Sequence, residues 1–149
     1  MSTAITLAGT ADRDRVLGLM AQFHAERGLA HDDVHRARAA DPLLEGSPLG
    51  AVWLIGPGRA PLGYVLVGFG WSVTRAGMEG WVNEVYIRPS VRRRGIGTEV
   101  LHAVAVALSQ AGLTALHVRV DHADEAAQRF CARVGFAARP EMLVMTDTL

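Results

Sequence analysis

The chain has 149 residues, of which half are hydrophobic and a fifth are charged. This length and balance predict one soluble globular domain, spanning residues 1–149, with a core of its own. The formal net charge is zero, so no overall positive field attracts nucleic acid, and we expect no nucleic-acid partner. Every basic residue is arginine, and the lack of lysine excludes a Schiff-base lysine and a P-loop lysine.

Cys131 is the single cysteine, so it has no internal disulfide partner, and no second ligand stands near it at metal-binding spacing. We expect no resident metal. The longest apolar stretches fall far short of a membrane span. The N-terminus lacks the basic stretch followed by an apolar one that marks a secretion signal. A cytoplasmic protein without a membrane partner is expected.

The first half of the sequence predicts two helices among short strands. Apolar residues recur at helical spacing after Asp12, which can cap a helix that Gly28 ends. A second helix is expected from 32 to 40 and is expected to stop at Pro42, because proline cannot continue a helix. The strands expected in this half, from their alternation and turn residues, are 5–8, 51–55 and 61–72.

The second half predicts a strand over 81–87, which Pro89 ends, and a helix over 95–111, which Gly112 ends. The elements expected after them are a strand over 115–120, a helix over 124–134 and a last strand over 142–145. The order β-α-α-β-β-β-α-β-α-β indicates a mixed α/β fold. Its sheet should be mostly antiparallel and flanked by helices, with the 95–111 helix as a crossover.

The most informative stretch lies between the 81–87 strand and the 95–111 helix. The first backbone N–H groups of a helix have no partner within the helix, and the helix dipole places partial positive charge there. Gly95 and Gly97 lack a Cβ, so a ligand can lie close to the backbone. Three arginines, Arg92, Arg93 and Arg94, stand at this end, where the dipole disfavours cations unless an anion is bound. The pattern predicts a site for a pyrophosphate.

Other interpretations of this loop fit less well. Two glycines alone can simply shape a turn beside solvated arginines. A dinucleotide-binding fingerprint needs a third glycine where Val100 stands, and a P-loop needs a lysine. A nucleic-acid patch would need interleaved aromatic residues and a net basic charge.

The segment from Arg92 to Gly97 resembles the R/Q-x-x-G-x-G/A signature of the GCN5-related N-acetyltransferases (GNAT family). Phe130-Cys131 followed by Gly135-Phe136 is similar to the family's F-Y-x-x-x-G-F segment, and the order of elements agrees along nearly the whole chain. The resemblance implies an acyltransferase whose acyl donor is acetyl-CoA.

The resemblance also implies how acetyl-CoA would bind. The loop that would hold the pyrophosphate comprises Arg92, Arg93, Arg94, Gly95, Ile96, Gly97 and Thr98. The pantetheine arm would lie along the strand backbone at Val85, Tyr86 and Ile87, with Asp124 and Ala127 on its other side. Family members are often dimers, so a homodimer is expected by resemblance.

Acetylation of an amine requires a group that accepts a proton, and Glu84 is the leading candidate. It lies in an otherwise apolar strand beside the expected thioester. Simple alternation groups Glu84 with Val82 and Tyr86 on one face, and Asn83 with Val85 on the other. Asn83 is a candidate substrate contact, and it departs from relatives that carry acidic residues at both positions. The competing interpretation of Glu84 is an exposed residue paired with a nearby arginine.

The proton donor to the leaving thiolate stays unassigned. Cys131 stands where many members of the family carry a catalytic tyrosine, and a thiol can donate a proton. A lone cysteine on the apolar side of a helix is more often a small core residue, which is the favoured interpretation. Tyr86 is a second candidate acid, although a strand tyrosine beside core residues usually serves packing.

The segment after the first helix is expected to form one wall of the acceptor pocket. His24, Glu26 and Asp32 can hold an amine or a carboxylate there, or can be the solvated end of a helix. His31 and His35 have the i,i+4 spacing of a metal pair but lack a third ligand. We expect direct acetyl transfer to an amine of a small molecule, peptide or protein. The alternative is a non-catalytic acyl-CoA sensor that keeps the anion site and lacks the chemistry.

Overall fold

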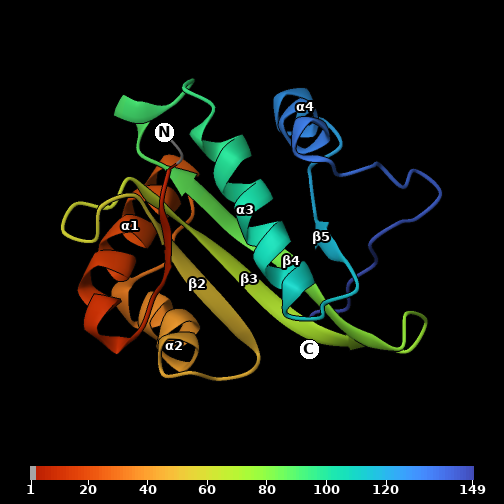
Figure 1. Ribbon diagram of the computed structural model, residues 1–149, viewed down its shortest axis with the longest axis horizontal. Coiled ribbons are helices and arrows are strands. Elements are labelled where there is room, and N and C mark those ends of the chain that lie inside the picture. Colours follow the sequence, from red (N-terminus) through yellow and green to blue (C-terminus); the bar gives the residue numbers. More distant parts are fainter. Residues whose placement is uncertain (1–2) are drawn as a thin grey trace.

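The computed structural model describes residues 3–149, so the first two residues of the expected domain lie outside the described part. Its strands form one sheet in the order β1-β2-β3-β4-β5 (Figure 1). Neighbouring strands are antiparallel, except β4 and β5, which are parallel. The predicted mixed α/β fold with a mostly antiparallel sheet is confirmed. The strands are β1 (Ile5–Leu7), β2 (Gly50–Ile55), β3 (Gly63–Ser72), β4 (Gly77–Ile87) and β5 (Leu116–Val118).

Helices cover both faces of the sheet (Figure 1). Alternation along β3 divides the core: Tyr64 and Leu66 belong to a cluster with α1 and α2, whereas Val65 and Val67 belong to a cluster with α3 and α4. No helix within residues 3–149 is long and apolar enough to cross a membrane. The α-helices are α1 (Arg13–Glu26), α2 (Asp33–Leu44), α3 (Ile96–Gln110) and α4 (Glu125–Val134).

The predicted ends of the first two helices are partly wrong. The helix α2 runs through Pro42 to Leu44, where Pro42 was expected to stop it. Proline removes one backbone hydrogen bond of the helix. Because Pro42 lies close to the C-terminal end of α2, few further helical hydrogen bonds are affected. Leu44 is only 5 % exposed, so its burial offsets that loss. Asp12 precedes α1, but its carboxylate accepts a hydrogen bond from the N–H of Gly9 (2.9 Å) instead of capping the helix.

The predicted last strand, 142–145, is also wrong, because the described residues after Val134 form no strand. Its four side chains, from Met142 to Met145, are between 60 % and 89 % exposed. A strand is stable only when a neighbouring strand takes its backbone hydrogen bonds. Strand-forming residues alone therefore do not make a strand here.

Candidate active site

A cleft opens where β4 and β5 separate. The two strands pair only from Gly80 with Leu116 to Val82 with Val118. Beyond this point lies a cleft of about 540 Å³, lined by residues of β4, β5, α1, α3 and α4 and of the loop before α3. The cleft thus runs along the part of β4, from Val85 to Ile87, where the pantetheine arm was expected to lie.

A β-bulge at Asn83 marks the point where the strands separate. Leu66 of β3 pairs with Glu84 and Val67 pairs with Val82, so Asn83 is an extra residue in β4. A bulge bends a strand and changes the direction of its side chains. Both Asn83 and Glu84 line the cleft, although only one of them was expected to face it.

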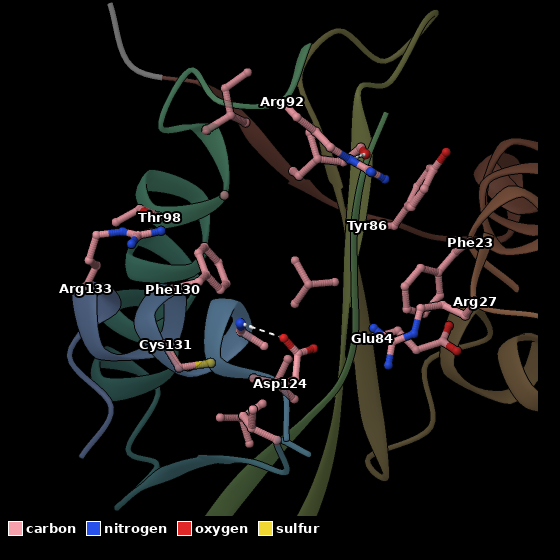
Figure 2. Close-up of a pocket in the computed structure, with 18 of the residues that line it drawn as sticks. Phe23, Arg27, Glu84, Tyr86, Arg92, Thr98, Asp124, Phe130, Cys131 and Arg133 are labelled. Carbon is pink, nitrogen blue, oxygen red and sulfur yellow. Dashed lines mark hydrogen bonds between the residues drawn. The ribbon is translucent and has the colours of Figure 1, made fainter. Parts of the chain in front are cut away.

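The expected alternation is therefore wrong at Val82, while Glu84 with Tyr86, and Val85 with Ile87, keep the predicted sides. Because Asn83 is extra, Val82 packs in the same cluster as Val85 and Ile87, on the side of α3. Tyr86 packs in the cluster of α1 and α2, and Glu84 points to that same side (Figure 2). The backbone of β4 thus separates a side that faces α3 and α4 from a side that faces α1.

The loop before α3 presents backbone groups to the cleft. Gly95 adopts a left-handed conformation (φ 75°) directly before the helix, and no side chain caps the helix there. The first hydrogen bond of the helix joins the N–H of Glu99 to the carbonyl of Gly95 (3.1 Å). The N–H groups at 96–98 thus precede the intrahelical ladder and are available to an anion. Gly95, Ile96, Gly97 and Thr98, the residues predicted to hold a pyrophosphate together with the arginines, all line the cleft.

Gly97 also allows α3 and α4 to pack closely. A Cβ at this position would lie 3.1 Å from Cε1 of Phe130 on α4, closer than ordinary van der Waals contact. Any larger residue would push the phenyl ring or the helix outward. Gly97 therefore fixes the wall of the cleft on this side and keeps its own amide accessible.

The three arginines of the loop are in different positions. The guanidinium of Arg92 donates to the carbonyl of Ile87 (2.8 Å) and to Glu26 of α1 (2.7 Å). This pairing raises the pKa of Arg92 and lowers that of Glu26. Arg93 lines the cleft in a left-handed conformation (φ 65°), whereas Arg94 is not among the lining residues. The three arginines therefore do not surround a single point.

Three lining arginines outside the loop, Arg27, Arg119 and Arg133, were not identified from the sequence. Arg133 lies on α4 and is drawn beside Thr98 at the start of α3 (Figure 2). Arg133 belongs to no recognisable sequence motif. Only the packing of α4 on α3 brings it to the cleft. Arg119 stacks on the ring of Trp81, 4.3 Å from its centroid.

On the α1 side, Glu84 is held by two side chains. Tyr64 donates a hydrogen bond to its Oε1 (2.8 Å), and Nε2 of His24 lies 2.7 Å from its Oε2. His24 is 2 % exposed and does not line the cleft, so it stands behind Glu84 instead of at the expected acceptor surface. The sequence separates these three residues by up to sixty positions, and only the fold brings them together.

The rest of the α1 wall consists of Phe23, Glu26 and Arg27. Arg27 lies over the ring of Phe23 (5.8 Å to the centroid) and is drawn close to Glu84 (Figure 2). The hydroxyl of Tyr86 donates to Gln22 (3.2 Å), and this side chain is 4 % exposed within the core cluster of α1. This environment agrees with the interpretation that Tyr86 serves packing.

The helix α4 forms the opposite wall. The carboxylate of Asp124 caps the helix by accepting from the N–H of Ala127 (3.0 Å), as predicted, and both residues line the cleft. Cys131 points toward the cleft from the same helix and is 8 % exposed (Figure 2). Burial, and then the negative charge of Asp124, raise the pKa of its thiol, so it stays protonated at neutral pH.

His31 and His35, the spacing of which suggested a metal pair, stack ring on ring with centroids 3.9 Å apart. Within residues 3–149, no group of three or more histidine, cysteine, aspartate or glutamate side chains could hold a metal ion. Asp32 caps α2 by accepting from the N–H of His35 (2.8 Å). It is therefore a helix cap and does not line the cleft.

These features fit an elongated ligand with an anionic part at one end and a reactive part at the other. Amides and Arg93 lie at the anionic end, and the carboxylate of Glu84 lies across the cleft. Acetyl-coenzyme A has this arrangement, with its pyrophosphate as the anionic part and its thioester as the reactive part. The residues present therefore fit the group that the sequence resemblance implied.

Comparison with known proteins agrees with this geometry. The model of the acetyltransferase (GNAT) family matches residues 19–136. An integron cassette protein, HFX_CASS3, from the mobile metagenome of Cole Harbour Salt Marsh is 28% identical, with a TM-score of 0.85 over 97% of this chain and 90% of that one. A possible acetyltransferase from Clostridium difficile 630 is 15% identical, with a TM-score of 0.87 over 100% and 99% of the two chains.

A third structure is that of AAC(6')-Iy in complex with the bisubstrate analogue CoA-S-monomethyl-acetylneamine. It is 14% identical, with a TM-score of 0.82, and the match covers 100% of both chains. No curated protein sequence matches the chain.

Proposed function

Because the chain belongs to the acetyltransferase (GNAT) family, we propose that it transfers the acetyl group of acetyl-CoA directly to an amine of a small molecule or a protein. The protein is an acyltransferase, and acetyl-CoA is its acyl donor. The observation that carries the proposal is the position of the Glu84 carboxylate. It stands at the gap between β4 and β5, across the cleft from the amides that open α3.

The donor would be held mainly by backbone groups. The N–H groups from Gly95 to Thr98 would bind the pyrophosphate, and the guanidinium of Arg93 would add charge. The free edge of β4 beyond Val82 offers the backbone of Val85 and Ile87 to the pantetheine arm. When bound, acetyl-CoA supplies an activated thioester to the gap.

On the acceptor side, an amine arrives mostly as an ammonium and must lose a proton before it can attack the thioester. Glu84 can take this proton. Each of its carboxylate oxygens accepts one hydrogen bond from the interior, which leaves a lone pair of each oxygen for the cleft. Asn83 beside it, and Glu26 with Arg27 on α1, are proposed to contact the acceptor.

Cys131 is proposed to pack the wall of the cleft and not to act as the acid. Its raised pKa makes the thiol a weaker acid than an ordinary thiol, so giving its proton to the CoA thiolate is uphill. A covalent relay would need a histidine beside Cys131 to activate it. His24 is engaged with Glu84, which lies across the cleft from α4 (Figure 2). The homodimer expected from the resemblance stays a prediction, which light scattering can check.

The experiment measures thiol release from acetyl-CoA with an amino acid, spermidine, kanamycin and a peptide with a free N-terminus. For the best acceptor, Glu84→Gln should lower kcat by about 100-fold or more, the usual contribution of a general base, while calorimetry shows unchanged acetyl-CoA affinity. Glu79→Gln is the matched control, because Glu79 lies on the same strand, pairs with His117 (2.8 Å) and does not line the cleft.

Two outcomes would contradict the proposal in different ways. If Glu84→Gln turns over at the wild-type rate, the carboxylate is not the base. If no amine supports thiol release while acetyl-CoA still binds, the protein is a non-catalytic acyl-CoA-binding module.

A further inference from the structure

The carboxylate of Glu84 is fixed from its interior side by two neighbours that do not touch the cleft. Nε2 of His24 lies 2.7 Å from Oε2, and the hydroxyl of Tyr64 lies 2.8 Å from Oε1. Neither His24 nor Tyr64 is among the lining residues, and their exposed fractions are 2 % and 0 %. The proposed base is thus oriented by a buried layer of polar groups.

The protonation state of His24 follows from its partners. An ionised carboxylate only accepts hydrogen bonds, so Nε2 of His24 must carry a proton and donate it. Nδ1 is buried and has no hydrogen-bond partner among the described residues. A proton on Nδ1 would create a buried cationic N–H without an acceptor, which costs more free energy than an unpartnered lone pair. The ring is therefore neutral, with its hydrogen on Nε2.

Tyr64 acts as a donor in the same way. Burial, followed by the charge of Glu84, raises the pKa of its hydroxyl, so the hydroxyl keeps its proton throughout the physiological range. Two donors on two different carboxylate oxygens leave the carboxylate little freedom to rotate. The fold therefore sets the direction of the remaining lone pairs before any substrate arrives.

We propose that His24 is a positioning residue for acetyl transfer: its neutral imidazole holds the carboxylate of Glu84 in the orientation that accepts the proton of the acceptor amine. The inference rests on the proposed function, in which Glu84 is the base. It assigns His24 an indirect part, because the ring does not line the cleft.

Other ring side chains lie on the far side of His24 from Glu84. His31 lies edge-on to it with ring centroids 5.0 Å apart, and His35 of α2 stacks on His31. Neither ring hydrogen-bonds to His24. Glu84 is thus the one hydrogen-bond partner of the His24 ring among the described residues.

The main test compares three substitutions at one position. In His24→Gln, the side-chain amide can place an N–H close to where Nε2 lies, but it cannot titrate. His24→Asn is too short to reach Glu84, and His24→Leu has no donor. With the best amine of the panel, we expect His24→Gln to keep kcat within about threefold, and the other two to lose about tenfold or more through misorientation. The KM for acetyl-CoA should not change in any of them.

Rescue by His24→Gln is a readout that a purely structural role would not move. His24→Gln and His24→Asn carry the same amide group, and only the longer side chain can reach Glu84, so kcat should separate the two variants while KM does not. The proposal is overturned if His24→Leu has wild-type kcat, or if folded His24→Gln is as impaired as His24→Leu. If Glu84→Gln is fully active, the proposed base itself has failed, which is a distinguishable result.

A measurement on the wild-type protein covers the case in which a variant at this buried position does not fold. Nitrogen-15 chemical shifts of the imidazole distinguish its tautomers. At neutral pH, His24 should carry its proton on Nε2 alone, and Glu84→Gln should change the shift of that nitrogen. A proton on Nδ1 at neutral pH would overturn the proposal without any need for turnover.

Discussion

The two walls of the cleft are built in different ways. The wall that we propose binds the donor (the donor wall), at the start of α3, consists mainly of backbone groups within one continuous segment from Arg93 to Thr98. The wall that we propose faces the acceptor (the acceptor wall) depends on side chains from three elements, in which Tyr64 of β3 and His24 of α1 meet Glu84 of β4. A local segment carries its function in its own sequence, whereas a side-chain network exists only in the folded chain.

The donor wall should be the easier one to break with a single substitution. Gly97→Val places a branched side chain where even a Cβ would lie 3.1 Å from Phe130. The strain and the crowding of the amides should lower the affinity for acetyl-CoA by about tenfold or more, as measured by calorimetry. Gly18→Val is the matched control, since nothing lies within 4 Å of a Cβ at Gly18 on α1. Equal affinities in the two variants would contradict a backbone-built donor site.

Next to the acceptor wall, His31 should make the stability of the fold sensitive to acid. Burial, and then the charge of His35, lower the pKa of His31 from 6.5. The unfolded chain therefore takes up this proton at higher pH than the folded one, and stability falls as the pH drops below about 6.5. In His31→Gln, the urea midpoint should fall less between pH 7.5 and 5.5 than in the wild type. Equal losses in both proteins would contradict the assignment.

The smallest effect is expected at Cys131, on the donor side. Cys131→Ala should keep kcat within about threefold, because a thiol with a raised pKa is a poor acid toward the CoA thiolate. Thiol release at saturating acetyl-CoA measures this. A loss as large as that of Glu84→Gln would make Cys131 the missing proton donor and would place catalytic side chains on both walls.

The same contrast explains what the sequence could predict. The loop at Gly95 and Gly97, which lines the cleft, could be singled out from the sequence, because its predicted chemistry depends on adjacent residues. Glu84 was recognised as a charge in an apolar strand, but its partner His24 carried no signal beyond being polar near a helix end. Arg92 was assigned to the anion, although its partner Glu26 is far away in the sequence.

For the fold, local patterns predicted most elements, and tertiary context accounts for the exceptions. Pro42 predicts a helix end by its backbone chemistry, but burial of Leu44 favours one further half-turn. Residues 142–145 have the composition of a strand and no neighbour to pair with. The bulge in β4 left no trace in the pattern, since Asn83 is compatible with either face of a strand.

The extra residue in β4 has one more consequence. Without Asn83, the remaining order Val82, Glu84, Val85, Tyr86 would alternate regularly, because Val82 and Val85 already pack in one cluster while Tyr86 packs in the other and Glu84 contacts His24 of α1. Deleting Asn83 would therefore preserve the hydrophobic core. It would also allow β4 and β5 to pair over more residues and so close the cleft between them. The deletion variant would then keep the fold and lose the activity. It would differ from the enzyme only by the absence of Asn83.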